Sequence, residues 1–358
     1  MTLEQCWHEV PGGTAVAGIE LARALREQPG VEVVGVAAKH SQPPPDPWKP
    51  PIEVRHMKMR RLAMYELWHR FRRADIRDAT GAVDVIHATT IAIPPRTAPL
   101  VVTIHDLAFL TEPKNFTKRG VSFFRKGLAI AWREADLILV PSTSTMQACL
   151  DSGFEEERLR LVPMGVRVEV AADALVTDTK ARYGLQRPYI LWTGTMEPRK
   201  NLPRLLHAFG KLAPEMDLVL VGPKGWKENI DRLLAGQRPD IKILGFMDSM
   251  DLSALYAGAD VFCFPSLEEG FGLPVLEAMA QGTPVVTSLG TSTEELGRGA
   301  AVLVNPRSAD SIMEGLRRVL DDPALRAQLS EAGRQRASDY SWTRTAQLTA
   351  AAYREAAG

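Results

Sequence analysis

The sequence predicts an α/β protein with two domains, each built around a parallel sheet. Segments with strand character alternate with helical segments along the whole chain, which is the pattern of parallel strands covered by helices on both faces. The chain has 358 residues, more than a single hydrophobic core usually supports, and two domains are therefore expected. Hydrophobic residues make up 45% of the chain and charged residues 24%, which is the composition of an ordinary globular protein.

The first domain is expected over residues 1–168. Its predicted strands are short apolar runs at Val31–Ala37, Val83–His87, Leu100–Ile104, Leu137–Val140 and Leu159–Val162. Its predicted helices are Ala15–Glu27, Leu62–Asp78 and Phe123–Ala135. Residues 1–7 leave little room for a strand before the glycine pair Gly12 and Gly13. We therefore expect either a shortened first strand or a natural start further upstream.

The second domain is expected over residues 188–340. Its predicted strands are Tyr189–Thr193, Leu218–Val221, Ile241–Leu244, Val261–Phe264, Pro284–Thr287 and Ala301–Val304. Residues 169–187 lose strand character and are followed by Pro188, which indicates an interdomain linker there. The last helix, within residues 341–358, is more amphipathic than a free tail requires, and we expect it to pack back on the rest of the chain.

Charge and cysteine content exclude several kinds of protein. The formal net charge is zero at pH 7, which argues against nucleic acid as a partner. The three cysteines, Cys6, Cys149 and Cys263, have no paired spacing, which indicates a reducing compartment and no zinc site. The sequence has no run of about 18 apolar residues and no charged and then apolar leader, so we expect neither a membrane span nor a signal peptide. A cytoplasmic protein is the expectation.

The most informative segment is residues 259–287, ADVFCFPSLEEGFGLPVLEAMAQGTPVVT. Val261–Phe264 reads as a buried parallel strand. Gly270 and Gly272 then permit a tight turn, and Pro274 suits the first turn of a helix. The N-terminus of such a helix attracts anions through its backbone N–H groups and its dipole. The segment therefore predicts a site for a phosphate or a carboxylate.

Two glutamates lie around this turn, Glu269 before it and Glu277 one turn into the helix. Carboxylates beside an anion site would repel phosphates unless they faced hydrogen-bond donors such as sugar or ribose hydroxyls. The combination therefore suits a sugar nucleotide. The alternative is an ordinary strand, turn and helix with two solvated glutamates.

A second segment, residues 191–201 with the sequence LWTGTMEPRKN, places basic residues after another strand. Gly194 follows the strand, and Arg199 and Lys200 come before the next helix. Arginine offers a two-pronged donor and lysine a point charge, so together they can neutralise a diphosphate. Open α/β sheets bind ligands at the carboxyl ends of their strands, which is where this pair falls. The alternative is a pair of solvated surface cations.

With these motifs, nearly the whole chain resembles the retaining GT-B glycosyltransferases of glycosyltransferase family four. The resemblance implies two Rossmann-like domains that face each other across a cleft, with the C-terminal helix crossing back to the N-terminal domain. It implies that Glu269 faces the hydroxyls of the transferred sugar and that Glu277 faces the nucleotide ribose. Arg199 and Lys200 would hold the diphosphate, and no divalent metal would be needed.

Further donor-binding residues follow from the same resemblance. The backbone of Gly270, Phe271, Gly272 and Leu273 would meet the donor sugar and phosphates. Phe246 and Met247 look like the turn that binds the nucleotide base, although a plain strand-to-helix loop is equally consistent.

The first domain is implied to contribute donor contacts as well. His105 follows the predicted strand Leu100–Ile104 at the position of a histidine that faces the donor sugar. Gly12 and Gly13 resemble the glycine loop that approaches the donor phosphates. A purely structural histidine is the alternative for His105.

The implied activity is transfer of a hexose, of the mannose, glucose or N-acetylglucosamine type, with retention of anomeric configuration. The donor would be a UDP- or GDP-sugar, and the acceptor a hydroxyl of a glycan, a lipid-linked molecule or a small molecule. The sequence has no Asp-x-Asp triplet and its seven histidines lack ligand spacing, so neither a metal nor another cofactor is expected. A sugar-nucleotide epimerase on the same fold and a non-catalytic nucleotide-sugar-binding scaffold remain alternatives.

Basic stretches mark the predicted acceptor side. Residues 55–77 carry eight Lys or Arg against two acidic residues, interleaved with aromatic and apolar ones, and residues 114–126 are similar in character. Such segments can lie on an anionic membrane, here the inner face of the cell membrane. They can equally hold an acidic soluble acceptor or form a solvated face.

Overall fold

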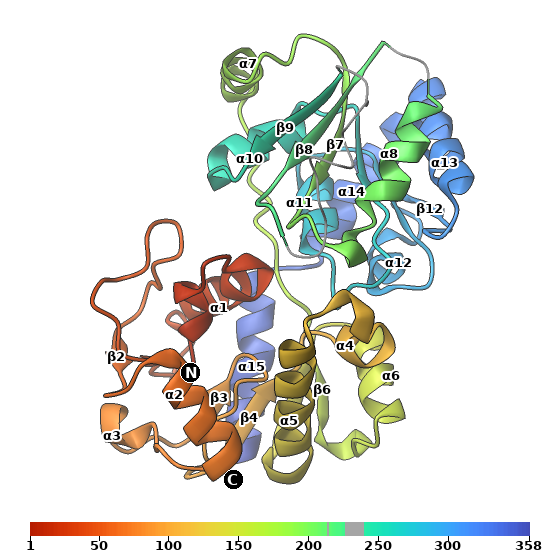
Figure 1. Ribbon diagram of the computed structural model, residues 1–358. Helices are drawn as coiled ribbons and strands as arrows, with labels where there is room; N and C mark the ends of the chain where they lie inside the picture. The colour runs from red at the N-terminus through yellow and green to blue at the C-terminus, as the bar shows by residue number, and fades with distance from the viewer. Residues whose placement is uncertain (213–214, 226–239) are drawn as a thin grey trace. The chain divides into compact units, whose positions relative to one another are not determined.

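The computed structural model describes residues 1–212, 215–225 and 240–358, which form two compact units (Figure 1). Unit 1 comprises Met1–Gly165 together with Trp342–Gly358, and unit 2 comprises Val166–Ser341. The strand pairs in both units are parallel, and helices lie between most of the successive strands. The predicted fold class, two parallel-sheet α/β domains, is confirmed.

The sheet of unit 1 is assembled around the first residues of the chain. Strands β3 (Ile86–Ala88), β4 (Leu100–Thr103), β5 (Leu137–Val140) and β6 (Leu159–Leu161) pair in that order, and β1 (Gly35–Ala37) pairs with β2 (Val54–His56). Residues 1–3 run between the two groups, because Thr2 N donates to His87 O and Leu3 N donates to Val36 O. A short first segment thus takes the place of a full strand.

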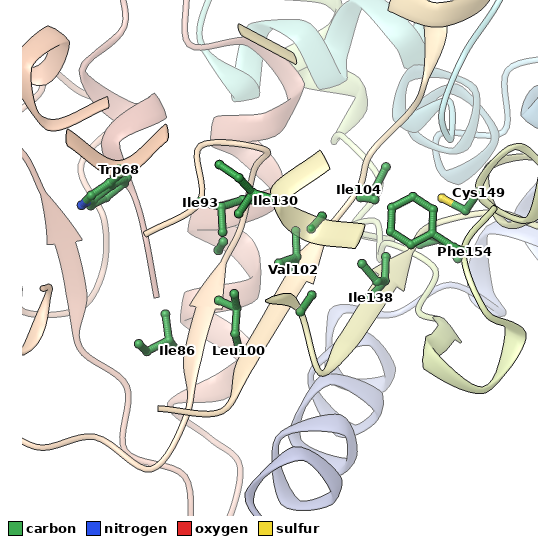
Figure 2. Packing of buried hydrophobic residues seen from close by; sticks show 14 of the residues in the cluster. Trp68, Ile86, Ile93, Leu100, Val102, Ile104, Ile130, Ile138, Cys149 and Phe154 are labelled. Carbon is green, nitrogen blue, oxygen red and sulfur yellow. The ribbon is translucent and has the colours of Figure 1, made fainter. Parts of the chain in front are cut away.

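Helices cover both sides of this sheet. They are α1 (Gly12–Leu25), α2 (Arg61–Glu66), α3 (Arg77–Thr80), α4 (Ala108–Thr111), α5 (Lys118–Glu134), α6 (Thr143–Asp151) and α15 (Trp342–Ala357). Figure 2 shows apolar side chains of β3, β4 and β5, such as Ile86, Val102 and Ile138, which form one core cluster with Ile130 of α5. On the other side, α15 packs against α1, β4 and β5. The last helix therefore completes the core of unit 1.

One helix of unit 1 differs from its prediction. Leu62–Asp78 does not form a continuous helix, because α2 passes into a π-helical turn, η2 (Leu67–Phe71), and the chain then adopts left-handed conformations at Arg72 and Ala74. The Arg72 guanidinium donates to the carbonyls of Trp68, Ile93 and Pro94 and pairs with Glu134. These contacts with distant residues stabilise the break. Strand β2 was not predicted at all.

Unit 2 contains a single six-stranded parallel sheet among its described residues. Its order is β12 (Val302–Val304), β11 (Val285–Ser288), β10 (Val261–Phe264), β7 (Tyr189–Thr193), β8 (Asp217–Val221) and β9 (Ile241–Gly245). The chain builds outward from β7 to β9 and then returns to β10 on the other side of β7. This reversal makes the gap between β7 and β10 the topological switch point, where Rossmann-like sheets bind their ligands.

The helices of unit 2 are α7 (Asp173–Arg182), α8 (Leu202–Gly210), α10 (Ser249–Ala257), α11 (Leu273–Ala280), α12 (Ser292–Gly297), α13 (Ala309–Asp321) and α14 (Pro323–Ser338). The segment expected as a linker, residues 169–187, contains α7, which packs on α10. Arg182 at the end of α7 pairs with Asp251 of α10 at 2.7 Å. Much of that segment is thus a packed helix of unit 2.

Candidate active site

The loops after β7 and β8 touch at glycines, which brings them together at the carboxyl edge of the sheet. Gly194 has a φ of +143° and Gly222 a φ of +136°. A Cβ atom on Gly222 would lie 2.1 Å from the carbonyl oxygen of Gly194, so a larger residue cannot stand there without moving backbone. The Gly222 N–H also donates to Gly245 O at 2.8 Å. These contacts hold the loops after β7 and β8 together at the edge of the sheet where the candidate site lies.

A short 3-10 turn, η5 (Pro198–Lys200), presents the two basic residues. Asn201 follows the turn in a left-handed conformation, with φ of 60°, and is the N-cap residue of α8. Its amide Nδ2 donates to Pro265 O at 2.8 Å and to Pro306 O at 2.7 Å. Asn201 therefore ties the turn to the loop that follows β10.

Arg199 and Lys200 meet the first glutamate across the switch point. Lys200 Nζ donates to Glu269 Oε1 at 2.5 Å, and Arg199 Nη1 donates to Glu269 Oε2 at 3.1 Å. Arg199 Nε also lies 2.7 Å from Glu197 Oε1. The Lys200 ammonium stands 4.7 Å from the centroid of the Phe264 ring, a cation–π contact. Two cations and two carboxylates thus form one cluster, in which Arg199 is half-buried and the other three side chains are buried.

The neighbouring cations keep the Glu269 carboxylate ionised. Burial raises the pKa of the Glu269 carboxyl, but the charges of Arg199 and Lys200 outweigh burial, and its pKa lies below the usual value. Burial lowers the pKa of the Lys200 ammonium, and the Glu269 carboxylate opposes that effect. Glu269 is therefore negative at neutral pH.

The glycine-rich turn leads into α11. Gly272 has a φ of +107°, and a Cβ there would lie 2.7 Å from Thr293 Cγ2, so this position requires glycine. The Ser292 hydroxyl donates to Glu269 O at 2.8 Å and to Phe271 O at 3.0 Å, which holds the turn in shape. Leu273 begins α11, and the positive end of its helix dipole faces the turn, as at an anion-binding helix start.

The second glutamate, Glu277, lies on α11 and is half-buried. Burial raises the pKa of its carboxyl, and a hydrogen bond from Tyr256 Oη at 3.0 Å opposes that rise. Tyr256 Oη also lies 2.7 Å from Thr193 Oγ1 at the end of β7. The turn, both glutamates and the basic pair thus belong to the edge of one sheet.

Phe246 and Met247 follow β9, two strands from β7 in the sheet. Phe246 is 54% exposed, whereas Met247 is buried. Gly245 before them has a φ of +70°. Their assignment to base binding stays a prediction.

Unit 1 holds the other predicted residues. His105 Nε2 lies 2.9 Å from Thr89 O and must donate to it, so Nδ1 carries the lone pair of the neutral ring. Nδ1 is buried without a hydrogen-bond partner among the described residues, and burial lowers the pKa of the ring. His105 lines a cavity of about 40 Å³ with Thr89, Thr103 and Thr345. Gly12 and Gly13 stand at the start of α1, where Cβ atoms would meet open space.

Several residues of the cluster were not predicted as site residues. Glu197 could have been found, because it precedes Arg199 by two residues in the same loop. Tyr256, Thr193 and Ser292 carry no sequence signal, since their contacts depend on how α10, β7 and α12 pack. In the part of the chain that the structure describes, no group of three or more His, Cys, Asp or Glu side chains is placed to hold a metal ion. No described helix is long and apolar enough to span a membrane.

A chain with two Rossmann-like parallel sheets, one of which carries basic side chains and an anion-binding turn at its switch point, has the features of the GT-B class of glycosyltransferases. Residues 11–170 match the family described as Glycosyltransferase Family 4, and residues 178–336 match Glycosyl transferases group 1. The chain belongs to glycosyltransferase family 4, and it is a glycosyltransferase.

Related proteins cover most of the chain. The O-antigen chain mannosyltransferase B of Escherichia coli is 32% identical over 306 residues, which is 82% of this chain and 80% of that protein. The MMP alpha-(1->4)-mannosyltransferase of Mycolicibacterium hassiacum is 32% identical over 307 residues, or 77% of this chain and 71% of that protein.

Solved structures share the fold. HepE of Anabaena, in complex with UDP-glucose, has a TM-score of 0.78 and 19% identity, with 97% of each chain covered. The sucrose-phosphate synthase of Thermosynechococcus elongatus has a TM-score of 0.79 and 22% identity, covering 99% of this chain and 97% of that one.

Proposed function

We propose that the protein transfers mannose from a nucleoside-diphosphate mannose to a hydroxyl of a glycan, a lipid-linked molecule or a small molecule. Transfer would retain the anomeric configuration and need no divalent cation or other cofactor. The relatives from Escherichia coli and Mycolicibacterium hassiacum are named as mannosyltransferases, which supports mannose as the sugar. The three cysteines are buried and free, which supports action in a reducing compartment such as the cytoplasm.

The observation that carries this proposal is the basic pair at the switch point of unit 2. Arg199 and Lys200 are the cations of the cluster, and the N-terminus of α11 lies at the same edge of the sheet. A leaving diphosphate placed there would meet a guanidinium and an ammonium group that Glu197 and Glu269 hold in position, together with the positive end of a helix dipole. Such preorganised charges lower the energy of the transition state without a reorganisation step.

Glu269 has a different role in this proposal. Lys200 and Arg199 hold one carboxylate oxygen each, which fixes the orientation of the group and keeps it ionised. The remaining lone pairs can accept hydrogen bonds from the hydroxyls of the transferred sugar. Positioning of the sugar therefore affects turnover, whereas the basic pair affects the affinity for the diphosphate.

Retention and metal independence are tested together. The purified protein is incubated with GDP-mannose, UDP-glucose and UDP-N-acetylglucosamine and with a mannose-containing acceptor, in EDTA and in Mg²⁺ or Mn²⁺. We expect mannose transfer to proceed equally in EDTA, and proton NMR of the first product to show the α anomer of the donor preserved. Loss of transfer in EDTA, an inverted product, or transfer of another sugar in preference to mannose would each correct one part of the proposal.

The basic segment of residues 55–77 was predicted to lie on the acceptor side of the protein. Arg55, Arg70, Arg72 and Arg77 of this segment are paired with acidic side chains, whereas Lys58, Arg60, Arg61 and Arg73 have no acidic partner among the described residues. Leu62 is 62% exposed and Phe71 52% exposed between them. Unpaired cations beside exposed apolar side chains complement an anionic bilayer. We propose peripheral contact with such a membrane through this segment.

Vesicle sedimentation tests the membrane contact. The wild type should pellet with phosphatidylcholine vesicles that contain phosphatidylglycerol and stay in solution with phosphatidylcholine alone, and salt should weaken the binding. The Arg60→Glu, Arg61→Glu double variant should lose it. The control Arg317→Glu, Arg334→Glu changes the net charge equally on α13 and α14 of unit 2, and should keep it. Equal loss in both variants would point to net charge rather than to this segment.

A further inference from the structure

A chain of hydrogen bonds links three elements of unit 2 beside the candidate site. Thr193 ends β7, Tyr256 stands in the last turn of α10, and Glu277 lies on α11. The Tyr256 hydroxyl lies 2.7 Å from Thr193 Oγ1 and 3.0 Å from Glu277 Oε2. Tyr256 is only 2% exposed and Thr193 only 4% exposed, so water cannot easily replace either partner.

The protons of this chain have one arrangement when Glu277 is ionised. A carboxylate only accepts hydrogen bonds, so the single Tyr256 hydroxyl proton goes to Glu277 Oε2. The tyrosine oxygen must then accept from the Thr193 hydroxyl. A hydrogen bond to a charged acceptor is stronger than a neutral one, and a donor behind it polarises it further.

The tyrosine itself is fixed from two other directions. Its ring packs edge-on against Phe262 of β10, with the ring centroids 5.2 Å apart. Its carbonyl oxygen accepts from Thr283 Oγ1 at 2.5 Å. The hydroxyl therefore stands at a defined point, and its contact limits where the Glu277 carboxylate can be.

We propose that Tyr256 is a positioning residue for Glu277, with Thr193 orienting the tyrosine hydroxyl. By holding Oε2, Tyr256 leaves Oε1 to accept from the neighbouring hydroxyls of the donor ribose. Among the described residues, no donor bonds to Oε1. This inference rests on the proposed function, because the ribose belongs to the nucleotide sugar.

Ribose discrimination is the measurement that separates positioning from mere stability. Dissociation constants of GDP and UDP, and of their 2′,3′-dideoxy forms, are measured by calorimetry for the wild type, for Tyr256→Phe, Glu277→Gln and Thr193→Val, and for the double variant that combines Tyr256→Phe with Glu277→Gln. Tyr189→Phe is the matched control, since that hydroxyl is also fully buried and donates to Leu255 O at 2.7 Å, away from Glu277.

We expect the wild type to bind the ribose form at least about tenfold more tightly than the dideoxy form, because two hydroxyls donate to a charged group. In Tyr256→Phe, this ratio of dideoxy to ribose dissociation constants should fall toward the value measured for Glu277→Gln. It should fall less in Thr193→Val and stay unchanged in Tyr189→Phe. The double variant should show the same ratio as Glu277→Gln alone, because both substitutions then act through the same carboxylate.

The inference would be overturned if Tyr256→Phe kept the dideoxy-to-ribose ratio of the wild type, or if Tyr256→Phe and Tyr189→Phe lowered that ratio equally. Either result would leave the proposed function standing. Additive effects in the double variant would overturn it as well. A wild type that binds neither GDP nor UDP would overturn the inference together with the proposed function.

Discussion

Replacing Lys200 by methionine tests the central ion cluster most directly. Lys200 is 8% exposed and Glu269 9% exposed, and their charged atoms are 2.5 Å apart. Methionine keeps most of the apolar stem of lysine, is one atom shorter, and removes the charged ammonium group that faces the Phe264 ring. The Glu269 carboxylate then remains buried with Arg199 as its main cation.

The expected cost follows from this geometry. Removing one partner of a buried ion pair typically costs about 3–5 kcal/mol, because the other charge is left without compensation. Arg199 still pairs with Glu269 at 3.1 Å, so we expect the low end, about 3 kcal/mol. For a domain of this size, each kcal/mol lowers the melting temperature by about 2–4 °C, which predicts a fall of about 6–12 °C for unit 2.

Thermal unfolding followed by circular dichroism checks this value, with Lys211→Met as control. Lys211 pairs with Asp310 at the surface, where both side chains are well exposed, and its removal should lower the melting temperature much less than removal of Lys200. Adding Glu269→Gln to Lys200→Met should recover much of the stability, since no buried charge then lacks its partner. Equal effects of Lys200→Met and Lys211→Met would refute the reasoning.

The same pair predicts a pH dependence. The pKa of Glu269 in the folded protein lies below its ordinary value, so its pairing stabilises the fold above that ordinary pKa. This contribution is lost as the pH falls through the lowered folded pKa. The difference in stability between the wild type and Lys200→Met should therefore be largest near neutral pH and shrink in acid. A difference that grows as the pH falls would contradict the assignment of charges.

Four other substitutions give separate expectations. Arg199→Ala should weaken binding of the nucleoside diphosphate, whereas Glu269→Ala should leave that affinity unchanged and lower turnover. Calorimetry measures the affinity and a transfer assay measures the turnover. Equal losses of affinity in the two variants would contradict the roles proposed. Gly222→Ala should destabilise by more than about 2 kcal/mol in chemical unfolding, because its Cβ would meet the Gly194 carbonyl at 2.1 Å, and a neutral change would show that the two loops can separate. Arg72→Ala should cost about 2–3 kcal/mol, since several carbonyls and a carboxylate lose their donor, and a loss under about 0.5 kcal/mol would show that the helix break needs no side chain.

Strands β7 and β10 of unit 2 could be predicted because they are buried on both faces. Tyr189–Thr193 and Val261–Phe264 are continuous apolar runs, and the structure has strands with the same bounds. The helix expected at Leu62–Asp78 was wrong beyond residue 71 for the opposite reason. Its periodicity is local, whereas its break depends on contacts between Arg72 and residues more than 20 positions later in the chain.

In the candidate site, too, several residues could be predicted from local sequence, whereas their contacts with distant residues could not. Arg199, Lys200 and Glu269 could be chosen because each follows a strand at the edge where Rossmann-like sheets bind ligands. Their mutual ion pairs could not be predicted, since the sequence does not state that β7 and β10 are neighbours. Tyr256 lies in a helix without any motif, and only the packing of α10 against α11 brings its hydroxyl to Glu277.

The return of α15 to unit 1 has a consequence for synthesis of the protein. Val101, Leu137 and Leu139 of the first sheet are covered by α15, yet the ribosome reaches that helix only after making Val166–Ser341. At about 5–20 residues per second, this apolar face stays bare for roughly 10–35 s while the intervening residues emerge. The nascent chain thus exposes an aggregation-prone apolar surface for many seconds, and chaperones at the ribosome bind surfaces of this kind.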